Sequence, residues 1–268
     1  MFGQEFWLNQ AEAFALFLAL GFVFWLLSRA QPINPPAPYA SRALGVNLLY
    51  QALGPFYGWL LLLLATGGLV YSGYVPDAVS DRLMHGAAPL NTLALWLQLP
   101  LLLLFTDMLQ YAMHRWLHGK MLWRFHAIHH APTQLEWHHA NRFHPINILL
   151  YTTLVTTAAL WAGFPLSSIL LLAPFNLAYS LMVHANVNWS FGPLRYVLAS
   201  PVFHRWHHAA DKAAYDKNFA PTFPFIDLLF GTFYMPKGAL PTQLGAAGAR
   251  VPEGFVGQML HPFRTTKT

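Results

Sequence analysis

The chain alternates long apolar stretches with short polar segments, and the apolar stretches have the length of membrane spans. Residues 6–27 contain one charged residue, Glu12. A helix needs about 20 apolar residues to cross the roughly 30 Å hydrocarbon core of a bilayer. The same criterion selects residues 45–70, with the run LLLLLA near its middle, and residues 89–113, 146–163 and 165–183. The turn between the last two is too short to hold a domain, so they form a hairpin that either spans fully or re-enters. The pattern predicts an all-α, multi-span membrane protein with four to five apolar helices.

Composition agrees with this prediction. The 268 residues are 56% hydrophobic and 9% charged, whereas soluble domains carry about 25% charged residues. The aromatic content of 16% excludes a disordered chain. Cysteine is absent, which excludes disulfides, thiolate iron–sulfur clusters and cysteine nucleophiles. The start of the chain has Glu5 and no nearby Lys or Arg, so it does not look like a cleaved signal peptide.

The basic residues predict the orientation, because cytoplasmic loops carry the excess of Lys and Arg. With the N-terminus outside and the C-terminus inside, Arg82 is the single one of the 15 basic residues that lies outside. The net charge of +5 is then a matter of topology, and no nucleic-acid partner is expected. A short chain without appended domains fits a bacterial inner membrane. We expect membrane helices and loops in residues 1–100, a catalytic domain in 101–236 and a tail in 237–268.

Histidine is the residue in excess. Twelve of the 14 histidines lie between His114 and His208, and eight of them form one HxxxH and two HxxHH clusters. These eight are His114, His118, His126, His129, His130, His204, His207 and His208. Residues three or four positions apart share a helix face, so each cluster can direct its imidazoles into one arc. Imidazole binds zinc, iron, copper and nickel, but eight ligands exceed the needs of one tetrahedral zinc. The clusters predict two metal ions at the cytoplasmic rim.

Other side chains are candidates for the same site. Asp107 and Tyr111 share a helical face with the first cluster, where a buried carboxylate can orient a ligand; the alternative is a helix-end Asp paired with an Arg. His184, at the end of the last apolar run, is a candidate ninth ligand or an interfacial residue. His138, His139 and His144 lack the repeated spacing, and line the site or bond its ligands. Four tryptophans form an interfacial belt or, less favoured, a pocket wall: Trp116, Trp123, Trp137 and Trp206.

Residues 101–236 resemble the integral-membrane fatty acid hydroxylase and sterol desaturase superfamily. The resemblance rests on the order HxxxH, HxxHH, HxxHH, on the Asp107 and Tyr111 lead-in, on the segment 142–145, on His184-Ala-Asn and on the closing segments 216–219 and 225–232. It implies a non-haem di-iron centre that uses O2 and two electrons to hydroxylate or desaturate a lipid.

The resemblance also implies a ligand set. It comprises the eight clustered histidines and His184. Some members have a further histidine where this chain has Ser180, so His144 or water is a possible substitute for a tenth ligand. The side chains expected to support the ligands are Asp107, Tyr111, His139, His144 and Asn218.

Electrons must come from a separate protein, because the chain has no cysteine for a cluster and no glycine-rich dinucleotide-binding turn. We expect a ferredoxin- or cytochrome-type donor with its reductase. It would dock on a basic cytoplasmic face near Arg115, Lys120, Arg124, Arg205 and Lys212.

Two other functions remain open. A zinc-dependent membrane hydrolase is the first, although no HExxH places a glutamate as general base. A metal-binding or transport protein is the second, although it would need ionisable residues along a mid-membrane path. The identity of the lipid, whether fatty acyl, sterol or carotenoid, is open as well.

Overall fold

The computed structural model describes residues 4–35, 43–54 and 76–264, and these are helical or irregular, with one isolated β-bridge between Ala209 and Leu244. Four helices have the length and apolar composition of membrane spans: α1 (Gln4–Ala30), α4 (Leu95–Leu117), α6 (Pro145–Ala162) and α7 (Leu166–His184). They match four of the five expected spans and confirm the all-α fold. The fifth expected span, 45–70, lies largely outside the described residues. Its described part, 45–54, is helical.

Helices α6 and α7 form the expected hairpin. His144 caps α6 by accepting a hydrogen bond from the backbone N–H of Ile146, and Pro145 occupies the first turn, where the missing N–H of proline has no cost. The helix ends at Gly163, whose φ of 113° favours glycine. The carbonyl of Gly163 accepts from the N–H of Ala87 at 2.9 Å, and a Cβ on Gly86 would lie 2.4 Å from the same oxygen. The hairpin turn and the chain that follows α3 (Asp77–His85) therefore meet closely at one end of the bundle.

Apolar side chains pack α4 against this hairpin. Leu102 of α4 lies in one buried cluster with Ala159 of α6, Phe164 of the turn and Leu172 of α7. Helix α1 packs on α7, where Phe17 and Leu181 form a second buried cluster with Trp137. A Cβ on Gly21 would lie 2.4 Å from the Trp137 ring, so α1 can approach this ring only with glycine at that position.

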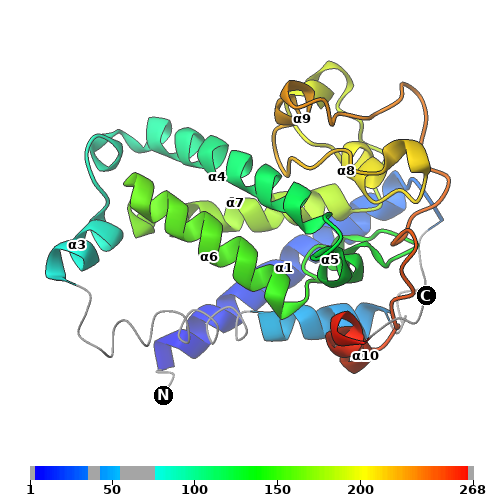
Figure 1. The fold of residues 1–268 in the computed structure, drawn as a ribbon, viewed down its shortest axis with the longest axis horizontal. Helices are drawn as coiled ribbons and strands as arrows, with labels where there is room; N and C mark the ends of the chain where they lie inside the picture. Colours follow the sequence, from blue (N-terminus) through cyan, green and yellow to red (C-terminus); the bar gives the residue numbers. More distant parts are fainter. Residues whose placement is uncertain (1–3, 36–42, 55–75, 265–268) are drawn as a thin grey trace.

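The shorter elements gather at the other end of the bundle, where α4 and α7 end and α6 begins (Figure 1). They are α5 (Trp123–His130), η2 (Trp137–His139), η3 (Gly192–Tyr196), α8 (Pro201–His207), η4 (Lys212–Ala214), α9 (Phe225–Leu229), α10 (Phe255–Leu260) and η5 (His261–Phe263). A 3-10 turn, η1 (Leu90–Thr92), precedes α4. This cap carries the two HxxHH clusters, and the HxxxH cluster lies beside it at the end of α4.

The tryptophan prediction is wrong for two of its four members. Trp137 and Trp206 are buried, at 3% and 5% exposure, and Trp206 packs with Phe203 and Val202 inside the cap. They are core residues, because the cap folds over them. Trp116 is half exposed, in agreement with an interfacial position.

Candidate metal centre

The structure brings all nine predicted ligands into two adjacent groups. The first group consists of His114, His118, His126, His130 and His207, and the second of His129, His184, His204 and His208. Within each group, one nitrogen from every ring lies within 4.8 Å of the others. The groups combine α4, α5, α7 and α8, so neither exists until the cap has folded onto the bundle.

Hydrogen bonding in the second group leaves nitrogen lone pairs facing one another. The Nδ1–H of His184 donates to the carbonyl of Ser180 at 2.7 Å, so the Nε2 of His184 has no proton. This Nε2 lies 3.0 Å from the Nε2 of His204 and 3.3 Å from that of His129. Nitrogens bound at about 2.1 Å to one metal, at 90–109°, are separated by about 3.0–3.4 Å. The donor set therefore fits a metal ion.

The first group has the same design. The Nδ1–H of His114 donates to the carbonyl of Phe219 at 2.8 Å, and that of His207 donates to the carbonyl of Lys217 at 2.8 Å. The Nε2 of His114 lies 3.0 Å from the Nε2 of His126. The Nε2 atoms of His118 and His207 are buried without a hydrogen-bond partner among the described residues. Unpartnered buried imidazole nitrogens are costly unless an ion binds them.

The environment keeps these rings neutral, which is the form that binds metal. Burial, and then repulsion between neighbouring rings, lowers the pKa well below the ordinary 6.5 for six of the cap histidines: His126, His129, His130, His204, His207 and His208. At neutral pH these imidazoles carry no proton that a metal would have to displace.

Asp107 supports the site differently from the prediction. Its two carboxylate oxygens accept hydrogen bonds of 2.9 Å from the backbone N–H groups of Thr222 and Phe223, and it bonds no histidine ring. The prediction that Asp107 orients a metal ligand directly is therefore wrong. The ring of His114 is oriented instead by the carbonyl of Phe219, in the loop that Asp107 holds.

Tyr111 holds the same loop through two further side chains. Its hydroxyl donates to Thr232 Oγ1 at 2.9 Å, and Thr232 donates to Asp227 Oδ1 at 2.7 Å. Asp227 also accepts from the backbone N–H groups of Phe219 and Ala220. Two buried carboxylates thus fix residues 219–223 through four backbone hydrogen bonds.

Asn218 stabilises the turn that contains Lys217, whose carbonyl accepts the hydrogen bond from His207. It has a left-handed φ of 58°, and its amide nitrogen donates to the carbonyls of Phe203 and Tyr234. This places the carbonyl of Lys217 against His207. In the same turn Asp216 lies 3.3 Å from the Nδ1 of His118.

His139 and His144 do not join the metal groups. His139 Nδ1 accepts from the backbone N–H of Glu136 in a local cap. Both ring nitrogens of His144 are engaged, because Nδ1 accepts from Ile146 and Nε2 donates to the carbonyl of Met259. His144 is therefore not a tenth ligand; it joins α6 to the C-terminal segment. Ser180, at the position of a possible tenth histidine, lines the cavity described below.

Two side chains differ from expectation or were missed. Arg205 was expected on the docking surface for the electron donor. It is 1% exposed and donates to the Leu135 carbonyl and to Asn186, so this prediction is wrong. Asn147, which no sequence pattern marks, is 1% exposed with its amide nitrogen 3.4 Å from His126 Nδ1.

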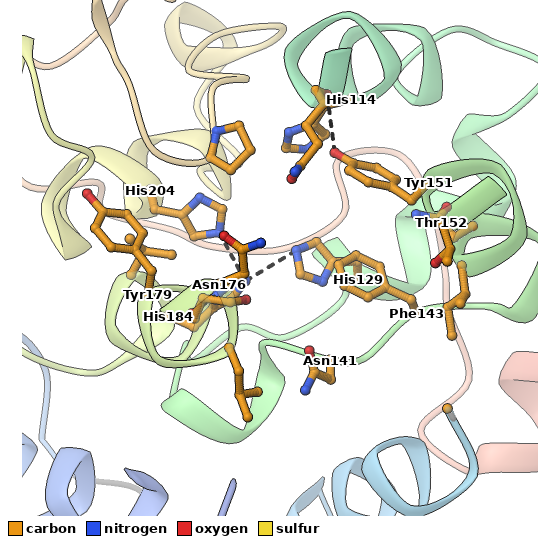
Figure 2. A pocket seen from close by; sticks show the side chains of 18 of the residues that line it. His114, His129, Asn141, Phe143, Tyr151, Thr152, Asn176, Tyr179, His184 and His204 are labelled. Atoms are coloured by element: carbon orange, nitrogen blue, oxygen red, sulfur yellow. Dashed lines mark hydrogen bonds between the residues drawn. The ribbon is translucent and has the colours of Figure 1, made fainter. Parts of the chain in front are cut away.

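A cavity of about 500 Å³ opens beside the histidines (Figure 2). Its lining comes from α4, α6 and α7, and also from the helical segment 43–54, α5, α8 and the loop 219–222. Five of the nine rings line it: His114, His126, His129, His184 and His204. The other four do not line it. No Asp, Glu, Lys or Arg is among the described residues that line the cavity, so any ligand is received by neutral side chains.

Comparison with known proteins places this site in a family context. The chain is 34% identical to the ornithine lipid hydroxylase of Rhizobium tropici over 57% of its own length and 46% of the relative's. It is 32% identical to the human alkylglycerol monooxygenase over 46% of the chain and 27% of the relative. It is also 31% identical to the delta(7)-sterol 5(6)-desaturase of Gibberella zeae over 52% of the chain and 38% of the relative. The chain therefore spans less than half the length of each, and no solved structure matches it.

The fatty acid hydroxylase family matches residues 99–232, which is half of the chain. This segment runs from α4 to Thr232, the residue whose hydroxyl accepts a hydrogen bond from Tyr111. It includes all nine histidines of the two groups. The chain belongs to the fatty acid hydroxylase family.

Proposed function

We propose that the protein uses O2 and external electrons to oxidise a C–H bond of a membrane lipid, at two iron ions held by the nine histidines. The observation that carries the proposal is the pair of converging imidazole groups beside a cavity between membrane helices. The names of the relatives support the reaction class: two are a hydroxylase and a monooxygenase of lipids, and one is a sterol desaturase.

The first group would hold one iron ion and the second group the other. When bound, such ions supply the redox chemistry that activates O2. The reaction consumes one O2, two electrons and two protons, and converts the C–H bond into an alcohol with release of water. Desaturation of the same substrate would consume the same reactants and give an alkene and two waters. The side chains of this chain hold the rings neutral and oriented, as described for His114, His184 and His207.

The cavity indicates from which side a substrate would reach the histidines. Because five of the nine rings line the cavity, the reacting carbon would approach along the face formed by those five. Part of the wall comes from α4, α6 and α7, which are membrane spans. A lipid would therefore enter laterally from the bilayer, and water would be largely displaced from the histidines by the hydrocarbon.

The neutral lining argues against hydrolysis. A metal-dependent hydrolase usually needs a carboxylate or similar base near the attacking water. Among the described lining residues the cavity has none. Metal transport is also disfavoured, since the nine histidines form two adjacent groups where α4 and α7 end, and not a path along the described spans.

The electron donor would be a separate ferredoxin- or cytochrome-type protein. Four of the five basic residues expected at its docking face are exposed in the cap: Arg115, Lys120, Arg124 and Lys212. A basic surface attracts an acidic partner and accelerates its encounter. The distribution of Lys and Arg supports a cytoplasmic position of the cap, and the spans would lie in a bacterial inner membrane.

Isotope incorporation tests the proposal. Protein reconstituted with lipid extract, iron, a chemical reductant and ¹⁸O2 should yield either lipid that contains ¹⁸O, the product of hydroxylation, or lipid that has lost two hydrogens, the product of desaturation. Mass spectrometry detects both. His129→Ala should abolish the signal, and omission of reductant should have the same effect. Incorporation from H2¹⁸O with cleavage of the lipid, and none from ¹⁸O2, would instead identify a hydrolase.

A further inference from the structure

A second cavity, of about 190 Å³, lies deeper in the bundle between α4, α6 and α7. Most of its own lining is apolar, from Leu102, Val155, Ala159, Ile169 and Leu172. The hydroxyl of Thr106, which also lines it, is used within its own helix, since it donates to the Leu102 carbonyl. This cavity has the character of a hydrocarbon site.

Four residues line both cavities and so form the junction between them. All four are polar and uncharged: Gln110 of α4, Tyr151 and Thr152 of α6, and Asn176 of α7. We call these four residues the polar collar. Figure 2 shows Tyr151, Thr152 and Asn176 among the side chains that surround the histidine cavity.

The two amides of the collar have no hydrogen-bond partner in the described part of the chain. The side chains of Gln110 and Asn176 make no hydrogen bond with any residue that the structure describes, whereas the Tyr151 hydroxyl donates to the backbone carbonyl of Gln110 at 3.4 Å. Both amides belong to membrane-spanning helices. Polar groups at that depth are costly when unpaired, and they commonly mark substrate pathways.

The position of the collar fixes its distance from the histidines. Gln110 precedes His114 by one turn of α4, and Asn176 precedes His184 by two turns of α7. At 1.5 Å per residue these offsets are about 6 and 12 Å along the helix axes. A group bound at the collar would therefore lie several bonds from a carbon held against the histidines.

We propose that the polar collar binds an uncharged hydrogen-bonding group of the lipid substrate, such as an ester or amide carbonyl or a hydroxyl. This inference rests on the proposed function. The hydrocarbon tail of that lipid occupies the deeper cavity, and the carbon to be oxidised lies on the other side of the collar, in the histidine cavity. The substrate is thus a lipid with a polar linkage between its tail and its oxidised carbon, and a plain hydrocarbon chain is a poor ligand.

Binding of two labelled probes of equal chain length tests the proposal. Radiolabelled 1-stearoylglycerol carries an ester and hydroxyls, and octadecane carries neither. Binding to the purified full-length protein is measured without O2 or reductant, so that no turnover takes place. Gln110→Leu and Asn176→Leu keep the side-chain volume and remove the polar atoms. Thr157→Val, at an exposed position of α6 that lines neither cavity, is the matched control.

Each amide variant should weaken binding of 1-stearoylglycerol by about fivefold or more, the equivalent of one hydrogen bond. Binding of octadecane should not weaken, and Thr157→Val should change neither affinity by more than about twofold. Metal content and helicity of the variants are measured to confirm folding. Equal affinity of wild type and both amide variants for 1-stearoylglycerol would overturn the proposal. A wild type that binds this probe selectively but neither incorporates ¹⁸O into lipid nor forms an alkene would contradict the proposed function and leave the collar intact.

Discussion

The carboxylate of Asp107 accepts a hydrogen bond of 2.9 Å from the backbone N–H of Thr222, a residue 115 positions later in the chain. Its second oxygen accepts from the N–H of Phe223. The loop held in this way contains the carbonyl of Phe219, which receives the Nδ1–H of His114. A membrane helix thus controls the orientation of one of its own metal ligands through a distant loop.

Asp107→Asn should destabilise this arrangement. The amide presents a donor to one of the two N–H groups, so one buried hydrogen bond is lost and an N–H is left unpaired. We expect a loss of about 1–3 kcal/mol in stability and a lower metal affinity, measured by thermal unfolding and metal analysis. Asp81→Asn, on the exposed face of α3, is the control. Equal melting temperatures for the two variants would show that Asp107 does not hold the loop.

Removal of one ligand from each metal group should lower metal content. His207→Ala acts on the five-histidine group and His129→Ala on the four-histidine group. Each variant should lose activity and retain less metal than wild type, as measured by mass spectrometry of the elements. His144→Ala should retain the wild-type metal content, because both of its ring nitrogens have other partners. A wild-type metal content in both His129→Ala and His207→Ala would contradict the assignment of these two residues as metal ligands.

Asn147 offers a test of how His126 is oriented. Its Oδ1 is buried without a partner among the described residues, and a half-turn of the amide brings this oxygen to Nδ1 of His126. Asn147→Leu should therefore lower metal affinity by about 10- to 100-fold, as loss of a ligand's hydrogen-bond partner commonly does. Asn147→Asp keeps an oxygen at this position and should retain metal. If the Leu and Asp variants bind metal equally well, Asn147 does not position the ring.

His138 should make the protein sensitive to acid. Burial, and then the nearby charge of Arg142, lowers the pKa of His138 from 6.5 to about 4, and its Nδ1 accepts from Asn47. The unfolded chain therefore binds the proton first as pH falls, so the stability from neutral His138 is complete above pH 6.5 and declines below it. At pH 5 the loss is about 2 kcal/mol.

His138→Gln keeps a neutral acceptor at every pH. Unfolding of wild type and variant at pH 7.5 and pH 5 measures the difference, and wild type should lose about 2 kcal/mol more on acidification. Equal losses in the two proteins would assign the acid sensitivity to other groups. The comparison isolates His138, since every other titrating residue is common to both chains.

The length of the apolar runs predicted the four described spans, and histidine spacing predicted eight of the nine candidate ligands. His184 was inferred from its place at the end of an apolar run and from the family resemblance. Ligand spacing is a local property, so three positions on one helical turn specify their own convergence. The hairpin of α6 and α7 was equally readable, because Gly163 and Pro165 interrupt a continuous apolar run.

The partners of those histidines were not predictable in the same way. Phe219 and Lys217 act through backbone carbonyls, for which side-chain identity gives no signal. The acceptors of Asp107 are backbone N–H groups more than a hundred residues away. The burial of Arg205 and Trp137 depends on how the cap folds over the bundle, which is tertiary information. The collar became visible only when the cavities brought Gln110 together with Asn176.

The metal content of the wild-type protein tests the central claim most directly. Protein purified under anaerobic conditions and loaded with ferrous iron should contain two irons per chain, one for each histidine group, and His129→Ala should contain about one. One metal ion in wild type, or a preference for a single zinc under the same conditions, would contradict the account.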